Sequence, residues 1–323
     1  MKILVLGGTV FLGRHVVQAA IDDGHEVTLF NRGRRNPQLF AGVERLVGDR
    51  NTDMGALRGR RFDAVIDCCG YTPAQLARTA EVLGGDVPHY VFVSTISVYA
   101  AFAPGVPYDE SAPIAAGAQG YGPLKARTEE AAEAAWPGRV AHVRPGLIVG
   151  PHDPTGRFAY WPARVARGAE VLAPGRPDRP TQFIDVRDLA NWCLHLAKQR
   201  TTGAFNAVGP LVPMAAVLEA CRSVTAAAAS FVWVPDEMLV AHGVEPFTGL
   251  PLWIPENDAA AGGLLLADAN HAAAAGLRVR PLIDTVRDTY EWITGDTEAV
   301  TSNPTTVTAE REAQLLAEVA RLA

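Results

Sequence analysis

Cysteine is scarce in this chain of 323 residues, and long apolar runs are absent. The four cysteines form no CxxC pair and no regular spacing, which argues against a disulfide framework and fits a reducing cytoplasm. No run of about 18 uncharged apolar residues occurs, so no transmembrane helix is expected. The apolar run at 3–6 is too short for a secretory signal, and we therefore expect a cytoplasmic protein.

The chain also lacks a basic excess. Lys and Arg together number 29 against 35 Asp and Glu, so the formal net charge is −6. Proteins that grip a phosphate backbone usually carry surplus positive charge, which argues against nucleic acid as a partner. No HExxH motif occurs, and His152-Asp153 has no third ligand nearby in the sequence, so no metal site is predicted.

The first half of the chain alternates strand-like and helix-like segments. Short apolar runs that predict buried strands lie at 3–6, 27–30, 44–47, 64–66, 90–93 and 140–143. Helical spacing falls between them at 14–21, 73–83 and 121–136. Strands separated by helices predict right-handed crossovers and an α/β fold with a doubly wound parallel sheet, the Rossmann fold.

The composition changes after Pro151, where Pro, Gly and Arg become frequent and periodicity is lost. A strand–helix–strand pattern returns at about 183–210, so two lobes are expected to interleave along the chain. The predicted units are a dinucleotide-binding domain of 1–150 plus about 183–210, a smaller substrate-binding lobe of about 151–182 plus 211–294, and a linker with a C-terminal helix over 295–323. That helix is amphipathic and could dock on its own chain or on a second copy.

A glycine-rich turn follows the first strand and leads into a helix, which is the context of a dinucleotide fingerprint. Glycine lets the backbone approach a pyrophosphate, and the helix N-terminus offers free N–H groups and a positive dipole end. The alternative is an ordinary strand–helix turn. The predicted cofactor contacts of this turn are Gly7, Thr9, Val10, Phe11, Leu12 and Gly13.

The end of the second strand carries Asn31-Arg32-Gly33-Arg34-Arg35 and no acid. NAD sites usually place Asp or Glu here on the ribose 2′-hydroxyl, whereas Arg accommodates a 2′-phosphate. We therefore predict cofactor contacts from Asn31 and Arg32 and favour NADP(H), with NAD(H) as the alternative. A solvated surface loop is the other interpretation of these arginines.

Tyr121 and Lys125 open the long helix four residues apart, on one face. A cation near a phenol favours phenolate, so Lys125 and an oxidised nicotinamide could together lower the pKa of Tyr121 from about 10 towards 7. Tyr121 would then act as a general acid/base. Thr95 follows a buried strand at its carboxyl end, where open parallel sheets bind ligands, and could hydrogen-bond a substrate oxygen. Alternatively, the hydroxyls simply cap that strand.

Together these motifs resemble the extended short-chain dehydrogenase/reductase superfamily, of the NAD-dependent epimerase/dehydratase type. They are GGTVFLG at 7–13, GDR at 48–50, VIDCCGY at 65–71, VSTISVY at 93–99, YGPLK at 121–125, RPGLIVGP at 144–151 and FIDVRDLA at 183–190. The resemblance implies that Thr95, Tyr121 and Lys125 are catalytic and that Lys125 also holds the nicotinamide ribose.

The resemblance also implies further cofactor contacts. Asp49 would contact adenine, with Arg50 beside it in the GDR motif, and Pro145 would flank the nicotinamide. Cys68 and Cys69 would line the cofactor, and we interpret their thiols as small buried side chains without a redox role.

The function implied is that of an NAD(P)-dependent oxidoreductase that acts on a carbonyl/hydroxyl group of a small molecule, and a homodimer is the state that the resemblance implies. Sugar dehydratases carry acids where this chain has Ile96 and Ser97, and nucleotide-sugar epimerases often carry Asn where it has 146–148. A nucleotide-sugar epimerase with retained NAD is the second hypothesis. A non-catalytic nucleotide- or RNA-binding member is the third, because the GGTxFLG loop also resembles a branch with plant chloroplast stem-loop RNA-binding proteins.

The predicted second lobe is rich in aromatic side chains and arginines. The aromatic residues could line a substrate pocket or form the core of the lobe: Tyr160, Trp161, Trp233, Phe247 and Trp253. The arginines could meet an anionic substrate, although each alone is interpreted as a surface residue: Arg157, Arg164, Arg167, Arg176 and Arg179. Asp185 and Asp188 are interpreted as structural.

Overall fold

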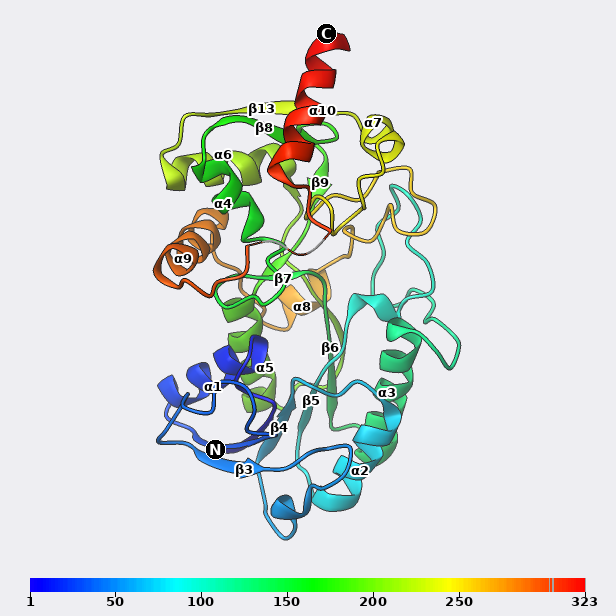
Figure 1. The fold of residues 1–323 in the computed structure, drawn as a ribbon. Coiled ribbons are helices and arrows are strands. Elements are labelled where there is room, and N and C mark those ends of the chain that lie inside the picture. The colour runs from blue at the N-terminus through cyan, green and yellow to red at the C-terminus, as the bar shows by residue number, and fades with distance from the viewer. Residues whose placement is uncertain (302, 304, 323) are drawn as a thin grey trace.

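A seven-stranded parallel sheet forms one half of the molecule in this computed structural model (Figure 1). The structure describes residues 1–301, 303 and 305–322; residues 302, 304 and 323, in the predicted linker and C-terminal helix, lie outside it. The strand order is β11-β6-β5-β4-β1-β2-β3. The strands are β1 (Lys2–Leu6), β2 (Glu26–Asn31), β3 (Glu44–Val47), β4 (Ala64–Asp67), β5 (Tyr90–Val93), β6 (Val140–Pro145) and β11 (Gly203–Ala207). The order reverses between β1 and β4, which confirms the predicted doubly wound sheet.

Helices cover both faces of this sheet, and the strand sequences show why. In β1, Ile3 and Val5 pack into one core while Leu4 and Leu6 pack into another, since successive side chains of a strand point to opposite faces. All four side chains are buried. The first core is covered by α1 (Leu12–Asp22) and α5 (Val186–Gln199), the second by α2 (Pro73–Leu83) and α3 (Tyr121–Ala135).

The other half of the molecule has its own apolar core, in which Trp161 and Trp253 are fully buried. Its helices are α4 (Tyr160–Ala166), α6 (Met214–Thr225), α7 (Asp236–Ala241), α9 (Leu282–Gly295) and α10 (Ala309–Leu322). Its strands β8 (Ala169–Pro174) and β13 (Ala229–Val234) pair in parallel, which the sequence reasoning missed. Both strands lie in the predicted second lobe, where the sequence shows no clear periodicity. The domain boundaries given above remain a prediction.

Short elements connect the two halves. They are the strands β7 (Ile148–Val149), β9 (Pro180–Thr181), β10 (Ile184–Asp185) and β12 (Val212–Pro213), the helix α8 (Asn270–Ala274) and the 3-10 turn η2 (Ile96–Val98). A further 3-10 turn, η1 (Gly55–Leu57), lies within the sheet half, where Leu57 packs in the core beneath α2. β7 pairs with β10, and β9 pairs with β12. Within the described residues, no helix has the length and hydropathy needed to cross a membrane.

Helix α10 docks on its own chain (Figure 1). Leu315 is fully buried in the apolar core of the half that contains Trp161 and Trp253, with Val319 packed against this core. Glu312, also buried, accepts hydrogen bonds from Arg164 Nε at 2.6 Å and from the Leu172 backbone N–H at 3.0 Å. A charge pair inside an apolar core is stable only while both partners are present.

Replacing Glu312 with Ala is expected to lower the free energy of unfolding by roughly 3–5 kcal/mol, because the buried Arg164 guanidinium then lacks its counter-charge. Urea unfolding followed by tryptophan fluorescence measures the change. Glu219→Ala is the control: Glu219 pairs with Arg222 on the surface, where such pairs contribute less than about 1 kcal/mol. Equal losses in the two variants would contradict a stabilising role for the buried pair.

Candidate functional site

The turn between β1 and α1 is held tight by glycine contacts. Gly7 and Gly8 have positive φ angles of 107° and 95°, which side chains rarely adopt. A Cβ added to Gly13 would lie 2.5 Å from the Gly8 nitrogen. The first turn of α1 contains no acidic residue, and among the described residues no side chain caps its N–H groups. This backbone cradle fits the pyrophosphate of a dinucleotide.

The predicted loop contacts surround this cradle in different environments. Thr9, Leu12 and Gly13 are buried, whereas the Val10 side chain is exposed at the tip of the turn. Phe11 precedes α1 and packs partly into the first core. Asn36 donates to the Thr9 carbonyl at 2.7 Å, a contact that sequence reasoning did not anticipate.

The end of β2 is tied to the same turn. The Asn31 amide donates to the Gly7 carbonyl at 3.0 Å and accepts from the Gly33 backbone N–H at 2.9 Å. Arg32 is exposed. The Asn51 backbone N–H, and more weakly the charges of Arg32 and Arg34, hold the pKa of Asp49 below its usual range. Arginine and an acid therefore share the rim where the adenosine half of a dinucleotide would lie.

Arg50 points away from this rim into the protein. Its guanidinium donates to both carboxylate oxygens of Asp67, at 2.7 and 2.9 Å, and to the Thr79 hydroxyl at 3.0 Å. Asp67 is fully buried and also accepts from the Tyr90 hydroxyl at 2.7 Å. Burial opposes ionisation of Asp67, but the Arg50 charge prevails and lowers its pKa. Both terminal nitrogens of Arg50 already donate to Asp67, so the predicted contact of Arg50 with the cofactor would have to coexist with this ion pair.

The two cysteines after β4 approach the glycine turn. A Cβ added to Gly7 would lie 3.6 Å from Cys69 Sγ and 3.8 Å from the Cys68 Cβ. Burial raises the pKa of Cys69 to about 11 and that of Cys68 further. Both thiols are therefore protonated near neutral pH and behave as small side chains.

Thr95 lies between β5 and η2 and is the N-cap of η2. Its hydroxyl accepts from the Ser97 backbone N–H at 3.1 Å and donates to the Ser97 hydroxyl at 3.2 Å. The residue caps η2 and lies at the carboxyl edge of the sheet. The cap uses a lone pair of the Thr95 oxygen, so a substrate oxygen would compete with the Ser97 hydroxyl for the Thr95 proton.

Helix α3 packs against η2 at the residue beside Tyr121. A Cβ added to Gly122 would lie 1.9 Å from the Ser97 carbonyl oxygen, so only glycine allows this approach. Tyr121 is 54% exposed. Its pKa is raised by partial burial, and the Thr95 side chain acts in the opposite direction. The phenol is therefore a protonated acid in the protein alone, and the lowered pKa predicted from Lys125 together with an oxidised nicotinamide concerns the cofactor-bound protein.

Lys125 lies beneath the site, 3% exposed. Its ammonium donates to the carbonyls of Gly70 and Val93, both at 2.6 Å, and lies 4.4 Å from the centre of the Phe92 ring. Burial lowers its pKa to about 8. Two of its three donors are used by the backbone, which leaves one for a ligand. Pro145, the last predicted contact, ends the neighbouring strand β6 and is buried.

The aromatic residues and arginines of the second half mostly serve its core. Tyr160, Trp161 and Trp253 are buried there, and Trp233 and Phe247 pack against them. Arg164 and Arg179 were interpreted as surface residues, and that interpretation is wrong, because both side chains are buried. Arg157 lies over the Phe247 ring, while Arg167 and Arg176 are exposed. Asp185 and Asp188 have structural partners: Asp185 accepts from Arg187 and Thr285, and Asp188 from Arg280.

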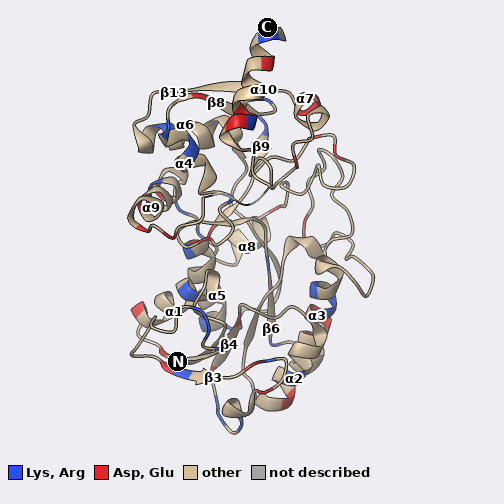
Figure 2. Cartoon of the chain, in the orientation of Figure 1, with Lys and Arg blue, Asp and Glu red and all other residues tan. Residues whose placement is uncertain are grey.

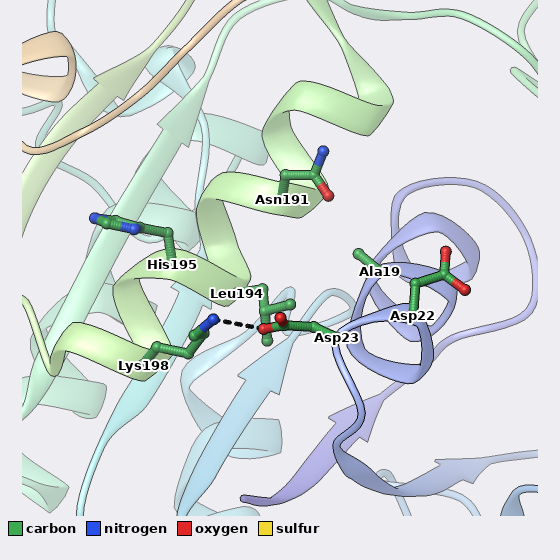
Figure 3. Close-up of a pocket in the computed structure, with 7 residues that line it drawn as sticks. All are labelled: Ala19, Asp22, Asp23, Asn191, Leu194, His195 and Lys198. Atoms are coloured by element: carbon green, nitrogen blue, oxygen red, sulfur yellow. Dashed lines mark hydrogen bonds and ion pairs between the residues drawn. The ribbon is translucent and has the colours of Figure 1, made fainter.

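A hollow of about 430 Å³ between α1 and α5 contains none of the predicted site residues (Figure 3). Asp23 and Lys198 pair across it at 2.5 Å, and His195 lies at its edge. Among the described residues, no three His, Cys, Asp or Glu side chains gather as a metal ion would require.

A family model described as "NAD dependent epimerase/dehydratase family" matches residues 3–83 and 72–207. The chain belongs to this family. A chloroplast stem-loop binding protein of 41 kDa from Arabidopsis thaliana is 26% identical over 60% of this chain and 54% of its own length. A UDP-glucose 4-epimerase from Erwinia amylovora is 27% identical over 40% of this chain and 47% of its own length. The chain thus matches about half the length of these curated relatives.

Solved structures of similar proteins share the fold. A UDP-glucose 4-epimerase superimposes with a TM-score of 0.71 at 17% identity, covering 93% of this chain and 99% of that one. The UDP-glucose 4-epimerase of Thermus thermophilus, solved in complex with NAD, gives a TM-score of 0.66 at 19% identity, covering 91% and 99%. At such identities the likeness concerns the fold.

Replacing Gly122 with Ala is expected to destabilise the protein by about 1–3 kcal/mol and to weaken cofactor binding, because the added methyl group forces α3 away from η2. Thermal unfolding and a cofactor titration measure the two effects. Gly85→Ala is the matched control, because a Cβ there would meet no atom within 4 Å. A Gly122→Ala protein with unchanged stability and affinity would refute the close packing.

Proposed function

We propose that this protein is a nicotinamide-dinucleotide-dependent enzyme that interconverts a carbonyl and a hydroxyl group on a small-molecule substrate. The proposal is carried by one observation: the Gly122 contact and the buried Lys125 bring Tyr121, Thr95 and the end of β5 together beside the glycine cradle. Family membership supports it.

Different residues of the chain would hold different parts of a dinucleotide. The cradle at Gly7–Gly13 would hold the pyrophosphate, and the remaining donor of Lys125 would hold the nicotinamide ribose. When bound, the nicotinamide ring exchanges a hydride with the substrate carbon. Tyr121 would transfer the proton at the substrate oxygen, and the Thr95 hydroxyl would orient that oxygen. Because the Tyr121 phenol is protonated in the protein alone, carbonyl reduction is the direction we favour.

Replacing Tyr121 with Phe is expected to reduce turnover roughly 10²–10⁴-fold, since the proton donor is lost, and to leave the dissociation constant of the cofactor unchanged. The assay follows NAD(P)H absorbance with a panel of small carbonyl compounds. Thr128→Val on the same helix is a control, because the Thr128 hydroxyl bonds only to the Leu124 carbonyl among the described residues. Full turnover by Tyr121→Phe would overturn the mechanism.

For the cofactor, we favour NADP(H) because the end of β2 offers the exposed Arg32 and Arg34 and no acid. The opposing consideration is that several solved structures with this fold are named as complexes with NAD, and that Asp49 lies near these arginines.

Titration of cofactor-free protein is expected to give a dissociation constant at least tenfold lower for NADPH than for NADH. Arg32→Gln is expected to remove most of this preference, because it removes a charge that meets the 2′-phosphate. Arg61→Gln, at an exposed position paired loosely with Asp86, is the control. Equal affinities in the unchanged protein would assign NAD instead.

A nucleotide-sugar epimerase with retained NAD is the second candidate, supported by the relatives named as UDP-glucose 4-epimerases. It predicts that purified protein carries NAD and interconverts UDP-sugars without net reduction. The third hypothesis, RNA binding, is supported by the Arabidopsis relative alone. Lys and Arg are scattered among Asp and Glu along the chain (Figure 2), and the formal net charge of −6 argues against RNA as a partner. Salt-sensitive binding of stem-loop RNA, unchanged by Tyr121→Phe, would favour that hypothesis over both enzymes.

A further inference from the structure

A buried ion pair joins α3 to β6 behind the proposed catalytic residues. Arg144 donates from Nε to Glu129 Oε1 at 3.0 Å and from Nη2 to Glu129 Oε2 at 2.7 Å. The two residues are 6% and 7% exposed. Two parallel bonds between planar groups fix orientation as well as distance. The pair therefore sets the rotation of α3 against the sheet.

The same guanidinium reaches a third element. Its Nη1 donates to the Tyr99 hydroxyl at 3.1 Å, and its carbon lies 5.1 Å from the centre of the Tyr99 ring. The Tyr99 hydroxyl in turn donates to Asn206 Oδ1 on β11 at 2.6 Å. Tyr99 directly follows η2, whose N-cap is Thr95. Arg144 therefore connects α3, the end of η2 and β11 from a single position on β6.

Three of the connected elements, α3, η2 and β6, carry a residue of the proposed site. Tyr121, Lys125 and Glu129 follow one another at intervals of one helical turn on α3, so they share a face. Thr95 begins the turn that ends at Tyr99, and Pro145 follows Arg144 on β6. We propose that the Glu129–Arg144 pair is a positioning device, which holds these elements in register and fixes the Glu129 carboxylate on the face of α3 that carries Lys125.

The charges around Lys125 support this assignment. Asp67 from β4 and Glu129 from α3 favour its ammonium form, while burial and Arg50 oppose it. Cys69 also faces it, and the Tyr71 ring lies 5.4 Å from its nitrogen. Glu129 itself is faced by Arg144 and His142, both from β6. Glu129 belongs to the pair under test and lies on the same helix as Lys125, so its removal tests the device most directly.

The composition of the chain allows a direct measurement. The sequence holds only three lysines, Lys2, Lys125 and Lys198. Protein labelled with ¹³C at lysine Cε therefore gives three NMR signals, whose shifts between pH 6 and 11 report each ammonium separately. Lys2 and Lys198 lie at the surface and serve as internal references. The titration needs neither cofactor nor substrate.

Glu129→Gln is expected to lower the titration midpoint of Lys125 by about one pH unit, because loss of a nearby negative charge disfavours the ammonium form. The midpoints of the other two lysines should not change. Glu130→Gln, an exposed neighbour on the same helix, removes the same charge and should leave all three midpoints in place. Glu129→Asp, which keeps the carboxylate, should restore the Lys125 midpoint. A folded Glu129→Gln protein with an unchanged midpoint would reduce the pair to a purely structural contact and overturn the proposal.

If Glu129→Gln does not fold, Glu129→Leu combined with Arg144→Met removes both charges, a replacement that buried ion pairs often tolerate. The midpoint of Lys125 should still fall, and an unchanged midpoint would again overturn the proposal. The inference rests on the proposed function, because it takes Lys125 to be part of the site. The two can nevertheless fail separately: a shifted midpoint with no cofactor binding would refute the function and leave the electrostatic coupling established.

Discussion

Burial of the Lys125 ammonium is the constraint on which the site depends. A charge that is 3% exposed requires compensation, and the backbone supplies part of it through the carbonyls of Gly70 and Val93. Those carbonyls follow β4 and end β5, so the ammonium joins the carboxyl ends of two neighbouring strands. The close approach of α3 at Gly122 brings the lysine within reach of them. The position of Tyr121, one turn earlier on the same helix, is a consequence.

Two ion pairs balance the charge further from the ammonium. Arg50–Asp67 lies on the β4 side and Arg144–Glu129 on the α3 side, and the four side chains are all buried. Each pair is close to neutral as a whole, but the carboxylates lie where they support the ammonium. Without these carboxylates, burial and the Arg50 charge would lower the pKa of Lys125 further. The site therefore depends on residues that contact no reacting atom.

Much of the fold could be predicted because its strands are local apolar runs. Ile3–Leu6 and the other buried strands of the sheet are recognisable without knowing their partners, and glycine marks the turn that follows β1. The β8–β13 pair was missed because these strands are only partly buried and lie among Pro-, Gly- and Ala-rich segments, where a short apolar run does not stand out. The Arg164–Glu312 pair leaves no local pattern, because its two members lie 148 residues apart. Arg164 and Arg179 were each interpreted as exposed because arginine taken alone is usually a surface residue. Both are buried, beside partners that lie far away in the sequence.

In the site, spacing along one helix was informative, whereas contacts between elements were not. Tyr121 and Lys125 could be paired from their interval of four, and the same interval extended once more reaches Glu129. Nothing in the sequence indicates that Arg144 meets Glu129, or that Arg50 turns from the cofactor rim towards Asp67. Those contacts decide which groups keep their charge, and hence which group can give up a proton. Lys125 is the clearest case: the helix interval places it one turn from Tyr121, but only the structure shows that two backbone carbonyls accept from its ammonium. Burial raises the pKa of Tyr121 in the protein alone, so the lowering predicted from Lys125 depends on a bound nicotinamide as well.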